Sequence, residues 1–268
     1  MRQAPSLDLV RRAVEVDAAY TLARMRVLER LAGNPIGIGY QCIENVTAFL
    51  AKNLPSPWFN RVVGLRGGQA DKIEPLVEWY RAQGMQPRFD IASGEDAEEL
   101  GRKLARLGFF QSGWHATLID EAEGVLATQD AAIERVTTAE AMDDFLAAYV
   151  AGWDVAPSWS DQFKSNVRPW LHEPGWAFYL ARVEGRPAAA AILYMQDEVS
   201  YLADAATDPA YRRRGLHAAL LRRRMRDAHA AGAAFVFSGA DFLSTSHRDM
   251  ERAGMRLLFL RAIWTQLG

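Results

Sequence analysis

The sequence contains a single cysteine, Cys42, so no disulfide can form within the chain. Proteins without disulfides are typical of a reducing compartment, and we expect a cytoplasmic protein. No run of residues has the apolar length of a membrane span, and the charges in residues 1–17 differ from the pattern of a signal peptide. We therefore expect no association with a membrane. Cys42 itself lies in a strand-like run, where we expect a buried small apolar residue.

The chain also lacks an excess of charge of either sign. Its 31 Lys and Arg residues and 33 Asp and Glu residues give a formal net charge of −2. Nucleic-acid binders usually carry a basic surface, so nucleic acid is the least favoured partner, although a basic helix near residue 222 keeps it as a third alternative. His115, His172, His217, His229 and His247 follow no metal-ligand spacing, and we expect no metal site.

Two common phosphate-binding motifs are missing as well. The sequence has no Gly-Lys-Ser/Thr P-loop and no G-x-G-x-x-G dinucleotide fingerprint. What it does have is length and apolar content: with 268 residues, half of them hydrophobic, it can form one large domain or two of ordinary size.

Hydrophobic periodicity predicts a mixed α/β protein. Helices are expected over 6–33, 71–84, 94–108, 139–153, 215–231 and 244–254, with Ser6, Thr138 and Ser244 as N-caps. Strands are expected over 36–43, 46–53, 60–65, 87–92, 109–119, 131–137, 176–183, 187–195, 199–206, 233–239 and 255–266.

The two halves of the chain end in the same order of elements: strand, helix, strand, helix, glycine and a long apolar strand. This repetition indicates an internal duplication and therefore two domains. We place them at residues 1–128 and 129–268.

The stretch "TDPAYRRRGLHAALL" carries the strongest functional signal. Arg212, Arg213 and Arg214 stand at the start of a helix, where the helix dipole is already positive. That arrangement favours an anionic ligand, because free backbone N–H groups at a helix N-terminus bind anions. Gly215 lets the backbone approach such a ligand closely.

Arg212-x-x-Gly215-x-His217 resembles the R/Q-x-x-G-x-G/A signature of the GNAT acetyltransferases. The similarity covers residues 131–268, and "RDMERAGM" resembles the family's late helix. The corresponding loop of the first half, "RGGQAD", lacks the signature. The chain thus resembles tandem GNAT proteins in which the N-terminal half is degenerate.

The resemblance implies two tandem GNAT-like domains, each with a mixed, largely antiparallel sheet flanked by helices. It implies acetyl-CoA as co-substrate, bound once, in the second half. The implied coenzyme-binding residues are Ala205, Ala206, Thr207, Arg212, Arg213, Arg214, Gly215, Leu216, His217 and Ala218. His217 departs from the family's Gly or Ala, so its side chain would either crowd the pyrophosphate or donate to it.

The activity implied is N-acetyl transfer to an amine of a small molecule or peptide, by direct attack in a ternary complex. At the position of the family's tyrosine acid stands Met250, which cannot donate a proton. On strand 199–206, Ser200, Leu202 and Asp204 are expected to share a face. Asp204 is the candidate base, with Tyr201 next in order; its alternative role is a structural hydrogen-bond acceptor.

Trp153, Trp159 and Trp170 are candidates for an aromatic wall of the acceptor site. Ordinary core packing is the alternative for these tryptophans. For the whole protein, the alternative to catalysis is a non-catalytic acyl-CoA-binding sensor or scaffold. For the oligomeric state, the sequence is compatible with both a monomer and a homodimer.

Overall fold

The structure, a computed structural model, describes residues 4–54, 56–94, 97–121 and 133–267. These residues form two compact units. The N-terminal unit contains residues 4–117, 240–242 and 257–268, and the C-terminal unit contains residues 118–239 and 243–256, each where described. The predicted boundary between residues 128 and 129 lies outside the described residues.

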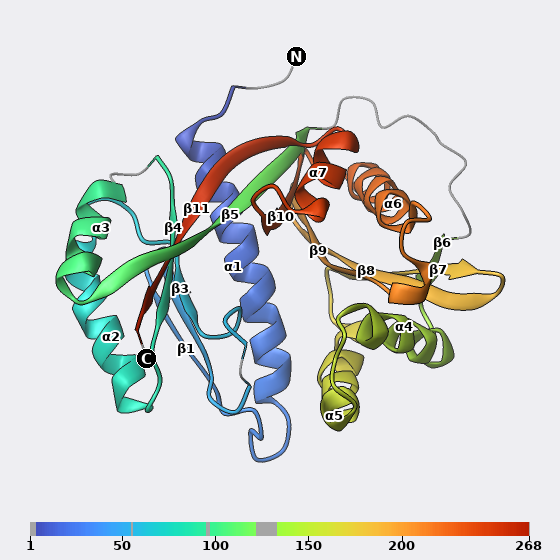
Figure 1. Ribbon diagram of the computed structural model, residues 1–268, viewed down its shortest axis with the longest axis horizontal. Helices are drawn as coiled ribbons and strands as arrows, with labels where there is room; N and C mark the ends of the chain where they lie inside the picture. The colour runs from blue at the N-terminus through green and yellow to red at the C-terminus, as the bar shows by residue number, and fades with distance from the viewer. Residues whose placement is uncertain (1–3, 55, 95–96, 122–132, 268) are drawn as a thin grey trace. The chain divides into compact units, whose positions relative to one another are not determined.

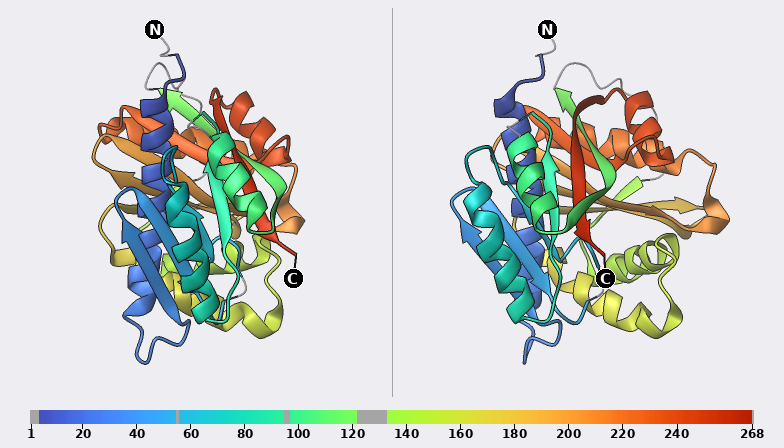
Figure 2. Two further views of the ribbon diagram at one scale, coloured as in Figure 1. Left: turned by 90° about the vertical axis from the view of Figure 1, so that its left-hand side faces the viewer. Right: turned by 60° about the vertical axis from the view of Figure 1, so that its left-hand side comes forward.

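The N-terminal unit has a mixed sheet in the strand order β1-β2-β3-β4-β11-β5. Its strands are β1 (Ile38–Ile43), β2 (Val46–Ala51), β3 (Arg61–Val63), β4 (Arg88–Ala92), β5 (Phe109–Glu121) and β11 (Arg256–Gln266). β3 and β4 are parallel, whereas β1, β2 and β3 run antiparallel in turn. β11, the last strand of the chain, pairs antiparallel with β4 (Figure 2). The sequence analysis had grouped this strand with the second domain.

Helices cover both faces of this sheet (Figure 1). α1 (Leu7–Glu29) lies on one face, and α2 (Ile73–Ala82) and α3 (Ala97–Arg106) lie on the other. Alternation along β2 explains the two layers: Ala48 and Leu50 pack into the cluster formed with α2 and α3, whereas Phe49 and Ala51 pack against α1.

The C-terminal unit has the strand order β10-β9-β8-β7-β6. Its strands are β6 (Ile133–Val136), β7 (Trp176–Val183), β8 (Arg186–Gln196), β9 (Val199–Thr207) and β10 (Phe235–Asp241). Its helices are α4 (Ala139–Gly152), α5 (Pro157–Val167), α6 (Leu216–Ala230) and α7 (Thr245–Arg252). β9 and β10 are parallel and the other pairs antiparallel. α6 covers one face and α4 the other (Figure 1), which explains why β7 and β8 are almost wholly apolar.

The α/β fold and the predicted elements are confirmed, with ends that shift by a few residues. Ser6, Thr138 and Ser244 are N-caps as expected, since each side chain accepts a hydrogen bond from the helix's first turn. The first helix is shorter than predicted and ends at Glu29. None of the helices in the described ranges has the combined length and apolarity of a membrane span.

Two expectations need correction. Residues 153–176 contain α5 and the 3-10 helix η2 (Arg168–His172), neither of which the sequence analysis predicted. Pro157 and Pro169 lie in the first turns of these helices, a position where proline is favoured. Cys42 is exposed rather than buried. It lies in β1, which is an edge strand of the sheet, and the last two residues of this strand are exposed to solvent.

A buried ion network joins four elements of the N-terminal unit. Arg61 on β3 lies 3.0 Å from Asp17 on α1 and 3.0 Å from Asp90 on β4. Arg261 on β11 reaches Asp17 at 2.6 Å, and Arg88 reaches Asp90 at 2.6 Å. Burial by itself would raise the pKa of Asp17, but the charges of Arg61 and Arg261 outweigh it and hold that pKa below its ordinary value. The network therefore stays ionised and fixes α1 to the sheet.

Asp17→Asn should lower the free energy of unfolding by about 3–5 kcal/mol, because it leaves two buried guanidinium groups short of a partner. Chemical denaturation at pH 7 measures this loss. Because the folded-state pKa of Asp17 is lowered, its contribution is present above the ordinary carboxyl pKa and disappears as the pH falls. The difference between the two proteins should therefore shrink below about pH 4.

The matched control is Asp8→Asn, which breaks an exposed α1 ion pair with Arg12 and should cost less than about 1 kcal/mol. Equal stabilities of the Asp17 and Asp8 variants would show that the buried network does not hold this unit together.

Candidate functional site

In the C-terminal unit, the site begins where two parallel strands separate. β9 pairs with β10 from Val199 opposite Phe235 to Leu202 opposite Ser238. The Ser238 hydroxyl donates to the Leu202 carbonyl at 2.9 Å and closes this pairing. The described pairing with β10 ends at Leu202 whereas β9 continues to Thr207, so the last part of this strand edge is where a ligand could approach the backbone.

A β-bulge lies in β9 just beyond the last residue that pairs with β10. Ala190 pairs with Ala206 and Ile192 with Ala203, so one residue of β8 faces two residues of β9. One of these two is Asp204, whose φ of 38° is in the left-handed region. The predicted shared face of Ser200, Leu202 and Asp204 is therefore wrong: the alternation ends at Ala203, because the extra residue changes the register of the strand beyond it.

Arg224 of α6 supports the bulge from inside the unit. It is 1% exposed, and its Nη1 donates to the carbonyls of Ile192 at 2.8 Å and Ala203 at 2.9 Å. Its Nε donates to the Leu220 carbonyl within the helix at 3.1 Å. The sequence analysis did not single out this arginine, and only its place among the apolar positions of the helix could have indicated it.

The N-terminus of α6 differs from those of α1, α4 and α7, because no side chain caps it. Its N-cap is Gly215, with a φ of 75°. A Cβ added there would meet no atom within 4 Å, so the space in front of the helix is open. Helix N–H groups facing open space form a site for an anion.

The three arginines of the loop divide into two kinds. Arg212 is held by the chain, since it donates to the carbonyls of Thr207 at 3.3 Å and Gly152 at 3.4 Å. Arg213 and Arg214 are exposed beside Gly215, and the Arg214 guanidinium lies 5.6 Å from the ring centre of Tyr211. Arg212 therefore positions the loop, while Arg213 and Arg214 supply charge at its surface.

His217 points toward α7. Its Nδ1 lies 3.3 Å from Asp249 Oδ2. Burial, together with the charge of Arg224, lowers the pKa of His217, so the ring is neutral at pH 7. Because the ring is engaged with α7, the departure from the family's small residue does not close the helix start.

α7 carries the position where the family's acid is expected. Met250 there is buried, 5% exposed, and has no proton to donate. His247 is buried on the same helix, with its Nδ1 3.8 Å from Glu251 Oε2. His247 has no role in the sequence-based predictions, although its spacing of four residues from Glu251 could have indicated this contact.

The tryptophans separate into core and surface. Trp170 is 1% exposed and packs 5.3 Å from Trp176, ring centre to ring centre. Trp153 and Trp159 are about half exposed, at 49% and 48%. The structure thus gives Trp170 a packing role and leaves the other two accessible.

Comparisons with known proteins agree with this geometry. Residues 120–243 match the family model described as "Acetyltransferase (GNAT) domain". No curated protein matches the chain. Among solved structures, a GCN5-related N-acetyltransferase from Kribbella flavida is similar at a TM-score of 0.65 and 17% identity, covering 96% of this chain and 97% of that one.

Two further structures are similar over nearly the whole chain. One is a GCN5-related N-acetyltransferase from Sphaerobacter thermophilus, with a TM-score of 0.63, 12% identity, and coverage of 96% of this chain and 91% of that one. The other is described as a tandem GNAT protein from the clavulanic acid biosynthesis pathway, without AcCoA. Its TM-score is 0.62 at 13% identity, and the match covers 98% of this chain and 96% of that one.

Residues 120–243 thus match a GNAT acetyltransferase domain, and the chain shares its α/β fold with solved GNAT proteins over nearly its full length. The domain that matches is that of an acyltransferase.

Replacing Arg224 by methionine should lower the free energy of unfolding by about 2–4 kcal/mol, since two buried strand carbonyls each lose a donor. Denaturant unfolding measures the loss. Arg226→Met is the matched control, because Arg226 lies on the same helix, more exposed, 4.0 Å from Asp227. If both variants were as stable as the wild type, Arg224 would not support the bulge.

Proposed function

We propose that the protein is an N-acetyltransferase that moves an acetyl group from acetyl-CoA to an amine of a small molecule or peptide. The observation that carries this proposal is the uncapped start of α6 at Gly215, directly after the segment of β9 that separates from β10. The start of α6 offers backbone N–H groups to the pyrophosphate of the coenzyme, and the edge of β9 offers hydrogen-bonding groups to the amides of its pantetheine arm.

The binding residues fall into two groups, one for the pyrophosphate of the coenzyme and one for its pantetheine arm. Arg213, Arg214 and the N–H groups of residues 215–218 would hold the pyrophosphate, with Arg212 fixing the loop through Thr207 and Gly152. The unpaired edge formed by residues 205–207 would hydrogen-bond the pantetheine arm, as an added strand does.

We propose one coenzyme per chain, because the equivalent loop of the N-terminal unit already uses its amides. There the Gly68 N–H donates to Glu99 Oε2 at 2.9 Å, and the Arg66 N–H donates to Gln69 Oε1 at 2.9 Å. A carboxylate at this loop takes the place of a phosphate and would repel one.

The transfer itself needs little from the protein beyond positioning and one proton acceptor. The amine nitrogen attacks the thioester carbonyl carbon, the C–N bond forms, and the C–S bond breaks to release the coenzyme A thiolate. Asp204, directly or through a water, takes the proton that the amine loses. The thiolate takes a proton from solvent, since a thiol pKa of about 8.5 makes it a tolerable leaving group without the acid that Met250 does not provide.

For the acceptor, exposed Trp153 and Trp159 favour an apolar or cationic amine, because indole faces attract ammonium groups. Both lie in the same unit as β9. Trp170 is left out of this wall because it is buried.

A second candidate is a non-catalytic acyl-CoA sensor or scaffold, favoured by the buried Met250 at the position of the family's acid. Release of coenzyme A from acetyl-CoA in the presence of a panel of amines separates the two candidates.

Gly215→Glu and Arg212→Ala should each weaken coenzyme A binding. The glutamate adds negative charge in front of α6, and the left-handed φ of this position adds about 1–2 kcal/mol of strain. Loss of Arg212 removes the charged donor that fixes the loop to the Thr207 and Gly152 carbonyls, worth about 1.5–3 kcal/mol, and should weaken affinity by roughly tenfold to hundredfold. Calorimetric titration gives both the affinity and the stoichiometry, expected to be one.

Arg186→Ala, at an exposed turn of the same unit, is the matched control and should bind as the wild type does. Unchanged affinity in the folded Gly215 and Arg212 variants would rule out this coenzyme site, and two molecules per chain would contradict the single site.

Asp204→Asn should lower kcat by about 100-fold or more, the usual contribution of a general base. Asparagine tolerates a positive φ, so the bulge and coenzyme A affinity should be kept. Asp197→Asn makes the same change at another positive φ, in the exposed turn between β8 and β9, and should not alter the rate. A variant as fast as the wild type at every pH would exclude Asp204 and point to Tyr201 or water.

A further inference from the structure

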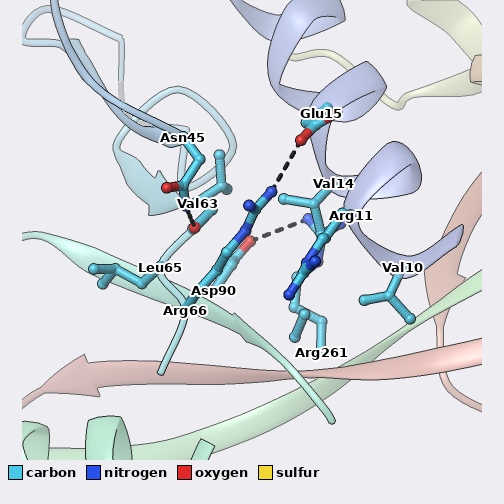
Figure 3. A pocket seen from close by; sticks show the side chains of 12 residues that line it. Val10, Arg11, Val14, Glu15, Asn45, Val63, Leu65, Arg66, Asp90 and Arg261 are labelled. Carbon is cyan, nitrogen blue, oxygen red and sulfur yellow. Dashed lines mark hydrogen bonds and ion pairs between the residues drawn. The ribbon is translucent and has the colours of Figure 1, made fainter. Parts of the chain in front are cut away.

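The N-terminal unit has a small open pocket of its own, lined by residues of α1, β3, β4 and β11 (Figure 3). It lies where β3 and β4 separate. These parallel strands pair only at Arg61 opposite Arg88 and Val62 opposite Phe89, after which β4 continues beside β11. The pocket thus occupies the same kind of split as the one between β9 and β10 in the C-terminal unit.

Among the residues that the structure describes, the base of the pocket carries more positive than negative charge. Arg261, 3% exposed, and Asp90 line it and belong to the buried ion network. In that network the three guanidinium groups of Arg61, Arg88 and Arg261 face the two carboxylates of Asp17 and Asp90, an excess of one positive charge.

The buried histidine nearest this network does not add to its charge. Burial, together with the charge of Arg261, lowers the pKa of His115 to about 3, so its ring is neutral at pH 7. The excess therefore comes from the arginines, and a monoanion at the pocket would balance it.

The walls of the pocket are apolar, whereas its mouth carries an ion pair. Val10 and Val14 of α1 and Val63 and Leu65 at the end of β3 supply apolar walls. At the mouth, Arg66 reaches across to Glu15 of α1 at 2.9 Å (Figure 3). The Glu15 side chain is 58% exposed, and exposed ion pairs of this kind are weak, so a ligand can compete for Arg66.

We propose that this pocket binds a small aliphatic carboxylate, whose carboxylate group replaces Glu15 as the partner of Arg66 while its chain lies between the valines and Leu65. Among the described residues that line the pocket, Arg11, Arg66 and Arg261 outnumber the carboxylates of Glu15 and Asp90, which favours an anion, and the aliphatic chain matches the walls. A phosphate-rich ligand fits less well, because Glu99 and Gln69 already occupy the loop amides. This site is separate from the proposed acyl-CoA site and does not depend on it.

Hexanoate is the probe, titrated into the full chain by calorimetry or followed by ligand-detected NMR, with hexanol as the uncharged control. We expect one hexanoate per chain and at least tenfold weaker binding of hexanol. Arg66→Gln should weaken hexanoate binding at least tenfold, whereas Glu15→Gln should strengthen it several-fold by removing the competing carboxylate.

Arg102→Gln is the matched control, because it breaks another exposed arginine–glutamate pair of the same unit, with Glu98, away from the pocket lining. It should bind hexanoate as the wild type does, and so should Gly215→Glu, which separates this test from that of the acyl-CoA site. No binding of hexanoate, equal binding of hexanol, or equal affinity in the Arg66 and Glu15 variants would overturn the proposal.

Discussion

Two neighbouring parallel strands that pair over a short stretch and then separate are the constraint on which each unit is built. The separation exposes backbone groups that a continuous sheet would satisfy, so each unit needs a device that keeps the split open. In the C-terminal unit, the device is the β9 bulge with Arg224 bonded to the Ile192 and Ala203 carbonyls. In the N-terminal unit, it is the ion network around Arg61. Both devices place buried arginine where strand pairing ends, because one guanidinium group has enough donors to serve several acceptors.

The same kind of split occurs in both units, but the loops that follow the two splits differ in chemistry. The loop before α6 leaves the helix start uncapped and surrounds it with arginines. The loop before α2 turns its amides inward to Glu99 and Gln69. One carboxylate is enough to disfavour a phosphate at this loop, since two like charges repel each other at this range. The two proposed sites thus differ because of a few side chains rather than because of the fold.

The sequence was sufficient for the elements that depend on local chemistry. Periodicity and capping residues identified the helices that begin after Ser6, Thr138 and Ser244, and the arginine loop identified the helix start at Gly215. It was insufficient where distant partners decide the structure. The bulge at Asp204 is defined by its pairing with β8, and Asp17 and Arg261 are 244 positions apart. Arg224 differs from its neighbours Arg222 and Arg223 by its place on the apolar face of the helix, but only the fold shows which strand carbonyls it bonds.

The position of β11 also limits how independent the two halves can be. The strand order places β11 between β4 and β5, although it comes after every other strand in the chain. A chain cut near residue 128 would leave β4 and β5 with unpaired edges and Asp17 without Arg261. The N-terminal unit therefore cannot complete its sheet until the last residues of the chain are available, and its long-range pairing makes it the slower part to fold. The ion network that shapes the pocket forms only at that point, because one of its three arginines arrives with the last strand.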